Sequence, residues 1–444
     1  MTLLDRAPTS PFVAPTESGT PRVDTRHPGS PVPAPHGVRR LLAAGLADAG
    51  EHVATFGPLP DIAPDRLLAE LELAGLTGRG GAGFPVHRKL RSARDAAHAG
   101  RSGRPVVVGN GSEGEPLSAK DRLLLRSAPD LVIDGLLLAA RAVDAAEVRL
   151  VADVELHPAL QTVLARRADA DTGGARIQLV AARGEFVGGE ASAVVANLEG
   201  KRPVPRDHPV RLTIAGYRRR PTLVQNVETL AHLALVARFG GAWFRSRGTA
   251  DDPGTRLVTV SAPGTPLTVL EIAGGTRLGT ILTAAGFGDA GLQPAGLGAG
   301  VRAVLVGGYH GSWVPGSALD APLDRAGLAP WGAAPGAGIL HVLPHGRCGL
   351  RTAAGIAGML AAESSGQCGP CVNGLPRIAG LLDRLARRER HPGLPAEIAR
   401  VGALVDGRGA CHHPDGTVRL VASTLREFAS DVDAHLAGAC EAER

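Results

Sequence analysis

The amino-acid sequence predicts an α/β fold, followed by a small α+β domain and a C-terminal helical bundle. Three changes of pattern along the 444 residues indicate this order. Short apolar runs typical of buried strands alternate with helical spacing over residues 75–200, β-rich runs dominate residues 256–315, and the spacing is helical from Cys348 almost to the end. The alternation in the first segment favours layered α/β architecture with a parallel or mixed sheet.

Individual elements follow from local patterns. Apolar residues three and four apart predict helices over 38–46, 64–73 and 131–145. Buried strands are expected at 106–108, 148–151 and 177–181. Ser118 is of a type that caps helices, so it is expected to cap a helix over 121–125. After Pro221 a helix is expected over 224–239, ending at Gly240-Gly241.

The remaining segments complete a four-part organisation. Within the α+β part, strands are expected at 257–261, 267–272 and 301–306, with a helix at 278–285. Residues 1–36 are rich in proline and lack a hydrophobic period, so a disordered tail is expected there. The expected boundaries are 1–36 for the tail, 37–250 for the α/β domain, 251–320 for the α+β domain and 321–444 for a linker and the helical domain.

Composition excludes several classes of protein. Basic residues number 48 and acidic residues 43, and only three of the bases are lysine, so positive charge is spread along the chain rather than gathered in a nucleic-acid patch. Aromatic residues make up 3% of the chain, which leaves little for base stacking. No run approaches 18 apolar residues, and the N-terminus lacks a basic and apolar leader. We therefore expect a cytoplasmic protein without a membrane span.

Glycine accounts for 60 of the 444 residues, about twice the roughly 7% found in average proteins. Several of these glycines lie within residues 75–83. Gly78, Gly80 and Gly83 match a dinucleotide-binding spacing, but the preceding segment is helical rather than a strand, so that fold is rejected. A loop without side chains lets backbone amides approach a phosphate or a flat ring, and Arg79 and Lys89 add positive charge. We expect a ligand loop here, the alternative being a loop used only for turning.

Two further loops carry polar groups. Residues 110–116 follow directly after the strand at 106–108, and ligands bind at the carboxyl ends of strands in open α/β sheets. A solvated acidic turn is the alternative for this loop. Gly188-Gly189-Glu190 precedes a helix expected over 191–198. Helix N-termini usually bind anions, but the negative charge of Glu190 favours a ligand hydroxyl or ring N–H at this helix.

The five cysteines are too few for a disulfide framework in a chain of this length. Cys368 and Cys371 are separated by two residues and Cys411 follows forty positions after Cys371, a pattern typical of iron–sulfur or zinc sites. Ser365 occupies the place of a further ligand, while His412 and His413 offer a zinc-like alternative. Cys348 is expected to be a small buried residue without a ligand role. Cys440, near the end of the chain, is expected to have no role in binding or catalysis.

Five motifs occur in one order and together resemble the family of flavin-bearing (51-kDa) subunits of respiratory complex I and the related flavin subunits of hydrogenases and formate dehydrogenases. They are GLTGRGGAGFP, NGSEGEP with AKDR, GGEASAVVANLEGKRPVPR, PTLVQNVETL and SSGQCGPCVNG. The resemblance covers about residues 60–440. It implies an FMN and NADH site in the α/β domain, a β-grasp (SLBB-like) insert, and a helical domain that holds one [4Fe–4S] cluster.

The resemblance also assigns residues. The FMN and NADH site is implied to include Gly78, Arg79, Gly80, Gly81, Ala82, Gly83, Phe84, Lys89, Asn110, Glu113, Glu115, Gly189, Glu190, Gln225 and Asn226, with Glu113 and Glu190 in catalytic positions. The cluster ligands are implied to be Ser365, Cys368, Cys371 and Cys411.

Several positions depart from the family pattern. Serine stands at 365 in place of the first cluster cysteine, and Ser112, Phe186, Ala191 and Gln225 replace an aspartate, a tyrosine, a glutamate and an asparagine. Ser92 and Arg211 align with aromatic positions that sandwich adenine in the family. A serine oxygen is a poorer iron ligand than thiolate, so a labile [4Fe–4S] cluster, a three-iron form and no cluster all stay open.

The function implied is an NADH dehydrogenase that passes electrons from NADH through FMN and the cluster to a ferredoxin or thioredoxin-like iron–sulfur subunit, or to a quinone-linked partner, peripheral to a membrane complex. In such enzymes the cofactor carries the hydride chemistry and the protein binds and orients. The alternatives are a diverged ferredoxin-linked flavoprotein that no longer uses NADH and a non-enzymatic metal-binding scaffold.

Overall fold

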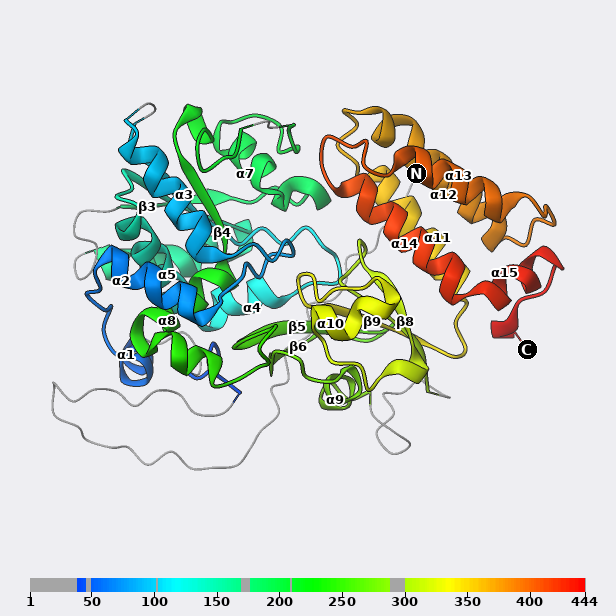
Figure 1. Ribbon diagram of the computed structural model, residues 1–444, viewed down its shortest axis with the longest axis horizontal. Helices are drawn as coiled ribbons and strands as arrows, with labels where there is room; N and C mark the ends of the chain where they lie inside the picture. Colours follow the sequence, from blue (N-terminus) through cyan, green and yellow to red (C-terminus); the bar gives the residue numbers. More distant parts are fainter. Residues whose placement is uncertain are drawn as a thin grey trace.

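The protein consists of an α/β domain, a sheet-containing insert and a helical domain, as seen in a computed structural model (Figure 1). The structure describes residues 38–44, 49–100, 103–168, 176–207, 210–287 and 300–443. The tail expected over 1–36 lies outside these residues. The α/β class with a helical C-terminal part is confirmed.

The α/β domain is built on a four-stranded sheet in which every described pairing is parallel. Its order is β3-β2-β1-β4, from β1 (Val106–Asn110), β2 (Glu147–Ala152), β3 (Ile177–Ala181) and β4 (Thr222–Asn226). The helix expected from residue 224 is wrong at its start, because Thr222–Asn226 is a strand and the helix begins at Val227. This strand lies beside β1, so its residues are buried on both faces of the sheet.

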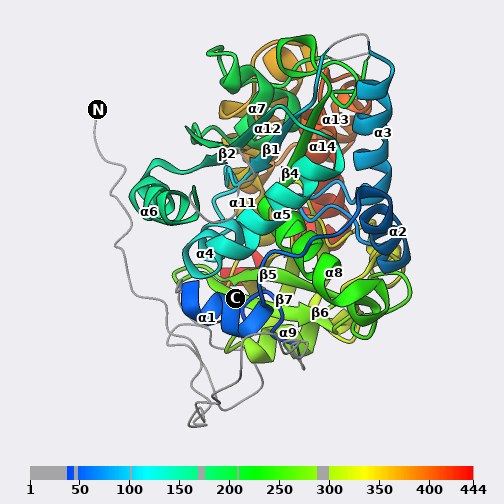
Figure 2. The same ribbon diagram turned by 90° about the vertical axis from the view of Figure 1, so that its left-hand side faces the viewer.

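The helices of this domain are α1 (Ala49–Phe56), α2 (Pro64–Ala74), α3 (Val86–His98), α4 (Lys120–Ser127), α5 (Pro129–Ala142), α6 (His157–Ala168), α7 (Ala191–Leu198) and α8 (Val227–Arg245). In Figure 2, α6 lies on the β2 side of the sheet and α3 lies on the β4 side. The helix expected over 38–46 is wrong for its described part, residues 38–44, and the first helix is α1.

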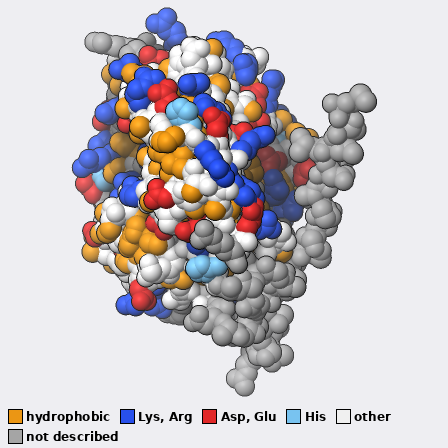
Figure 3. Space-filling view, turned by 90° about the vertical axis from the view of Figure 1, so that its right-hand side faces the viewer, with side chains coloured by type: hydrophobic (Ala, Val, Ile, Leu, Met, Phe, Trp, Pro, Cys, Tyr) orange, Lys and Arg blue, Asp and Glu red, His pale blue; other side chains and the backbone are white. Residues whose placement is uncertain are grey.

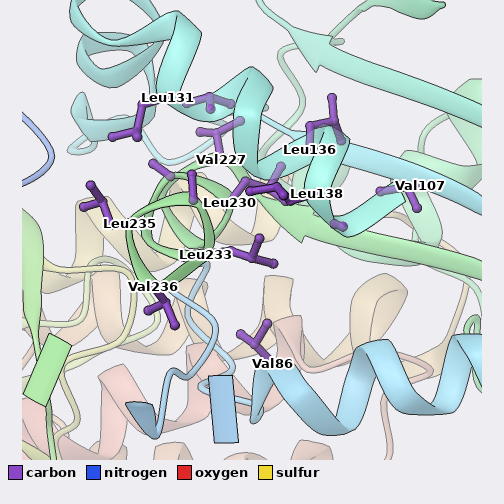
Figure 4. Packing of buried hydrophobic residues seen from close by; sticks show 14 of the residues in the cluster. Val86, Val107, Leu131, Leu136, Leu138, Val227, Leu230, Leu233, Leu235 and Val236 are labelled. Carbon is purple, nitrogen blue, oxygen red and sulfur yellow. The ribbon is translucent and has the colours of Figure 1, made fainter. Parts of the chain in front are cut away.

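Helices α5 and α8 form the centre of the core. Side chains of α8, among them Val227, Leu230 and Leu233, lie amid Leu131 and Leu136 of α5 (Figure 4). Glycine at position 135 is required here, because a Cβ atom would lie 1.9 Å from the Leu230 carbonyl oxygen. Helix α8 breaks at Gly240, whose φ of 84° is in the left-handed region, and then continues to Arg245.

The insert contains a five-stranded mixed sheet of order β6-β5-β9-β7-β8. Its strands are β5 (Thr255–Ser261), β6 (Thr268–Ala273), β7 (Val301–Val306), β8 (Ser312–Pro315) and β9 (Ile339–Pro344), and its helices are α9 (Leu278–Ala284) and α10 (Arg325–Leu328). The middle strand, β9, comes from beyond residue 320. The domain boundary at 320 and the β-grasp assignment stay predictions.

The helical domain packs on the outer face of this sheet. Its helices are α11 (Gly349–Ala362), α12 (Leu375–Ala386), α13 (Leu394–Val405), α14 (His413–Glu427) and α15 (Ala429–Leu436). Trp313 of β8 is buried against this bundle, with its ring edge-on to Phe428 and its indole N–H donating to Thr424 Oγ1 at 3.1 Å. The sheet and the bundle therefore share one core.

The surface is mixed in character. On the side of the helical domain, basic, acidic and hydrophobic side chains are interspersed, and neither charge dominates this face (Figure 3). Within the described part of the chain, every helix is too short or too polar to cross a lipid bilayer.

Candidate functional site

The carboxyl ends of β1 and β4 lie side by side, because Asn110 and Asn226 are partners in the parallel register. Asn226 Oδ1 accepts from the Glu228 N–H at 3.0 Å and so caps α8. Its Nδ2 donates to Asp121 Oδ2 at 2.6 Å, and a carbonyl contact to Asn110 lies at 3.5 Å. Two of the predicted binding residues are thus fixed at one sheet edge.

The glycine loop reaches this edge from the other side. A bridge between Thr77 and Pro85 closes the loop at its base, and the Gly78 N–H donates to the Phe84 carbonyl at 2.9 Å. Gly80 comes so close to Asn226 that a Cβ atom at Gly80 would lie 3.2 Å from the Asn226 Cβ. The backbone of Gly80, Gly81 and Ala82 is exposed, so it is open to a ligand.

Arg79 points away from this opening. Its guanidinium is buried and donates to Asp252 Oδ1 at 2.9 Å and to the carbonyls of Pro253 and Thr255 at 3.0 and 3.2 Å. The positive charge of Arg79 is therefore already paired with the Asp252 carboxylate, which lies in the segment that leads into β5. The backbone N–H of Arg79 is taken as well, because it donates to Thr229 Oγ1 at 2.8 Å.

Lys89, on α3, faces the sheet. Its ammonium donates to the Val224 carbonyl at 2.5 Å. Burial lowers the pKa of Lys89 to about 8, against the opposing effect of the Glu190 carboxylate. A lysine in this state gains its full charge when an anion such as a phosphate comes near.

The acidic loop after β1 caps the N-terminus of α4. Glu113 accepts hydrogen bonds from Ser118 Oγ at 2.6 Å and from the N–H groups of Asp121 and Arg122, both at 3.1 Å. The expectation that Ser118 caps this helix is wrong, because the hydroxyl donates to Glu113 and the Glu113 carboxylate takes the free N–H groups of the first turn.

Glu190 caps the N-terminus of α7 in the same way. Its Oε2 accepts from the N–H groups of Ser192 at 2.8 Å and Ala193 at 3.2 Å, and from the Ser192 hydroxyl. The preceding Gly189 carbonyl accepts from Asn110 Nδ2 at 2.9 Å. The helix opened by Gly188-Gly189 is therefore tied to the end of β1.

Three predicted site residues have buried polar atoms that lack a hydrogen-bond partner among the described residues: Arg79 Nε, Glu115 Oε1 and Gln225 Nε2. Burial raises the pKa of Glu115 to about 7. Buried polar atoms are paired in nearly all folded proteins, so unpaired ones beside an open glycine loop fit a polar ligand such as FMN.

Sequence reasoning missed a buried charge network under the site. Lys120 donates to Asp121 Oδ1 at 2.9 Å and to Glu228 Oε2 at 2.7 Å, and all three side chains are buried. Burial acts to lower the pKa of Lys120, but the two carboxylates raise it above its ordinary value. Charged residues at the start of two otherwise apolar helices were the available signal.

Two of the predicted cluster ligands, Cys368 and Cys371, lie close together in the helical domain. Cys368 Sγ lies 3.7 Å from Cys371 Sγ, which lies 3.8 Å from the buried Ser365 Oγ. Burial acts to raise the pKa of Cys368, but hydrogen bonds from the backbone of Ala410 and Cys371 lower it overall. Burial raises the pKa of Cys411, and the charges of Cys371 and Glu190 act in the same direction.

Three thiols and one buried hydroxyl suit iron, so the donor set fits an iron–sulfur centre with one oxygen ligand. His412 is exposed and pairs with Asp415 at 3.2 Å, and His413 bonds the Leu360 carbonyl at 2.8 Å. Neither histidine is grouped with these cysteines as a compact single-ion site in the described chain.

A surface hollow of about 440 Å³ lies along α3, away from the strand ends. It is lined by Arg88, Arg91, Ser92, Asp95, Ala96 and Ile214. The Ser92 hydroxyl is within 2.8 Å of Thr213 Oγ1. The side chain at the position aligned with an adenine-stacking aromatic is thus polar and hydrogen-bonded.

The fold and this arrangement of loops fit a redox protein with a flavin site in the α/β domain and an iron–sulfur site in the helical domain. Residues 71–235 match the family model described as the Nuo51 FMN-binding domain, and residues 351–435 match the NADH-ubiquinone oxidoreductase-F iron–sulfur binding region. The two matches together span more than half of the chain. The chain belongs to the family of complex I 51-kDa flavin subunits.

Relatives agree with this family. The F 2 subunit of NADH-quinone oxidoreductase from Rhizobium meliloti is 28% identical over 391 residues, covering 85% of this chain and 90% of the relative. The HndC subunit of NADP-reducing hydrogenase from Solidesulfovibrio fructosivorans is 27% identical, covering 84% and 76%. The solved structure of air-oxidized NAD+-reducing [NiFe]-hydrogenase matches with a TM-score of 0.75 and 31% identity, over 84% of this chain and 63% of that chain.

Proposed function

We propose that this chain is the electron-entry subunit of an NADH-oxidising complex. FMN, when bound, would supply the chemistry that accepts a hydride from NADH and releases electrons singly. The observations that carry the proposal are the approach of the open glycine loop to Asn226 at the end of β4, the Lys89 ammonium on the Val224 carbonyl, and the unpaired buried atoms of Glu115 and Gln225.

The residues of the chain have separable tasks at this site. The exposed backbone of Gly80 to Ala82 and the ammonium of Lys89 would bind the phosphate of FMN. Glu115 and Gln225 would orient the polar edge of the ligand through their unpaired atoms. Glu113 and Glu190 hold the N-termini of α4 and α7, so they position the loops that surround the ligand.

Cys368, Cys371, Cys411 and Ser365 would hold the iron–sulfur centre. The electron acceptor is proposed to be an iron–sulfur subunit of the ferredoxin or thioredoxin-like type. The relatives named as complex I and hydrogenase subunits support a place in a larger cytoplasmic assembly, peripheral to any membrane.

An anaerobic titration of the FMN-loaded protein with NADH tests the proposal. We expect the flavin absorbance to bleach as NADH is added and to return when a one-electron acceptor is supplied. Bleaching by a reduced ferredoxin, with no response to NADH, would overturn the proposal and support a ferredoxin-linked flavoprotein. Chemically reducing the same sample with dithionite controls for the presence of competent flavin.

A further inference from the structure

A second group of metal-ligating side chains lies at the far end of the helical domain. Cys348 stands at the start of α11, His435 near the end of α15, and Cys440 just after α15. All three are buried, and their ligand atoms lie within 4.8 Å of one another. Cys440 was expected to be idle at the end of the chain, but it is part of this cluster.

The histidine in this group is oriented as a metal ligand is. His435 Nδ1 lies 3.0 Å from the Leu385 carbonyl oxygen, which can only accept, so Nδ1 carries the proton. The other nitrogen, Nε2, therefore presents its lone pair 3.5 Å from Cys348 Sγ. A backbone carbonyl that fixes the outer nitrogen of a ligating imidazole is a usual feature of protein metal sites.

Asp431 adds an unpaired oxygen to the same region. It stands four residues before His435 on α15, so both side chains leave the same face of the helix. Its Oδ2 accepts from Arg302 Nη2 at 2.7 Å, whereas its buried Oδ1 has no hydrogen-bond partner among the described residues.

We propose that Cys348, Cys440 and His435 form a structural zinc site; Asp431 lies outside their 4.8 Å group, so its Oδ1 would have to move toward the ion to become the fourth ligand. Zinc prefers two to four thiolate or imidazole ligands in a closed tetrahedron, with Zn–S about 2.3 Å and Zn–N about 2.0–2.1 Å. These lengths put a sulfur and a nitrogen about 3.6 Å apart, close to the 3.5 Å between Cys348 and His435.

This site is separate from the proposed iron–sulfur centre. In the described chain, Cys348, His435 and Cys440 are the one group of three whose ligand atoms all lie within 4.8 Å, which is the compactness that a single ion needs. The cysteines at 368, 371 and 411 belong to another loop cluster. The zinc ion would join the start of α11 to the segment after α15, two parts of the chain 92 positions apart.

Zinc analysis of the purified holoprotein, desalted after exposure to zinc, tests the site. We expect about one zinc per chain in the wild type. Cys440→Ser and His435→Gln should each lose most of this zinc, whereas the matched control Cys368→Ser should keep it while losing iron. The helical content of each variant, measured by circular dichroism, shows that the chain has folded.

Cobalt provides a second readout that does not depend on activity. Co(II) added to zinc-free protein should give thiolate-to-cobalt charge-transfer absorption in the wild type and in Cys368→Ser, but only weakly in Cys440→Ser. Zinc that disappears with Cys368→Ser and stays in Cys440→Ser would overturn the proposal. A Cys348–Cys440 disulfide found by mass spectrometry of protein prepared under reducing conditions would do the same.

Discussion

Glu115 of the α/β domain accepts a hydrogen bond from the backbone N–H of Tyr309 in the insert, at 3.2 Å. The contact is close, because a Cβ atom at the neighbouring Gly308 would lie 2.9 Å from Glu115 Oε2. The loop that follows β1 is therefore in direct contact with the turn between β7 and β8. Ionisation of the Glu115 carboxyl should therefore affect both the flavin site and the interface between the α/β domain and the insert.

Stability of the flavin-free protein should fall as pH rises from about 4.5 to about 7. The pKa of Glu115 is raised from 4.5 to about 7 by burial, so the folded state keeps a proton that the unfolded chain has lost. The loss should be on the order of 3 kcal/mol at most for this residue. Glu115→Gln should flatten the dependence of the melting temperature on pH in this window.

Glu155→Gln is the matched control, since this glutamate is exposed. It should leave the pH dependence as in the wild type. Glu271, whose pKa burial also raises to about 7, contributes a second part of the same slope, so Glu115→Gln reduces the slope without abolishing it. An undiminished slope in Glu115→Gln would contradict the assignment.

Lys89→Gln should weaken the binding of FMN. A hydrogen bond to a charged group contributes about 1.5–3 kcal/mol, so the dissociation constant should rise roughly ten- to a hundredfold. Fluorescence quenching of FMN by the flavin-free protein measures the constant. Lys201→Gln, which removes an exposed lysine paired with Glu199, should bind FMN as the wild type does. Equal affinities for the two variants would exclude Lys89 from the phosphate site.

Ser365→Cys should raise the iron content of protein purified without oxygen and slow the loss of iron in air. Position 365 is buried and lies beside Cys371, so a thiolate there completes a set of four sulfur ligands. Ser364→Cys places a thiol one position away as the control and should leave iron unchanged. An unchanged iron-to-protein ratio in Ser365→Cys would argue against a cluster at this loop.

Glu113→Ala should lower the free energy of unfolding by about 0.5–2 kcal/mol, the usual cost of losing a helix cap. The carboxylate holds two N–H groups at the start of α4, which the alanine leaves without a partner. Chemical denaturation of the flavin-free protein measures the change, with Glu155→Ala as the exposed control. Full stability combined with lost NADH oxidation would instead assign Glu113 a direct part in the reaction.

The sequence predicted β1, β2 and β3 because each is a short apolar run between turn signals. It missed β4, in which Leu223 and Val224 are separated from the start of α8 at Val227 by only two residues, Gln225 and Asn226. A strand buried on both faces has no alternation of polar and apolar residues, so only its neighbours in space distinguish it from the start of a helix.

The candidate site was predictable as a set of loops but not in its detailed contacts. Asn110 and the loop after it follow a strand, which is enough to place them at a ligand-binding edge. The partner of Arg79, however, is Asp252, 173 positions away, and His435 lies 87 positions from Cys348. Pairings over such distances depend on how the domains pack, which a local pattern does not encode.

Arg79 has a consequence for how quickly the site can fill. Its buried bonds to Asp252 and the backbone of Pro253 fix the middle of the glycine loop before any ligand arrives. A loop anchored in this way loses little conformational entropy when it binds a ligand. The loop is therefore preorganised, and flavin capture should proceed as a single bimolecular step whose rate scales with flavin concentration without levelling off.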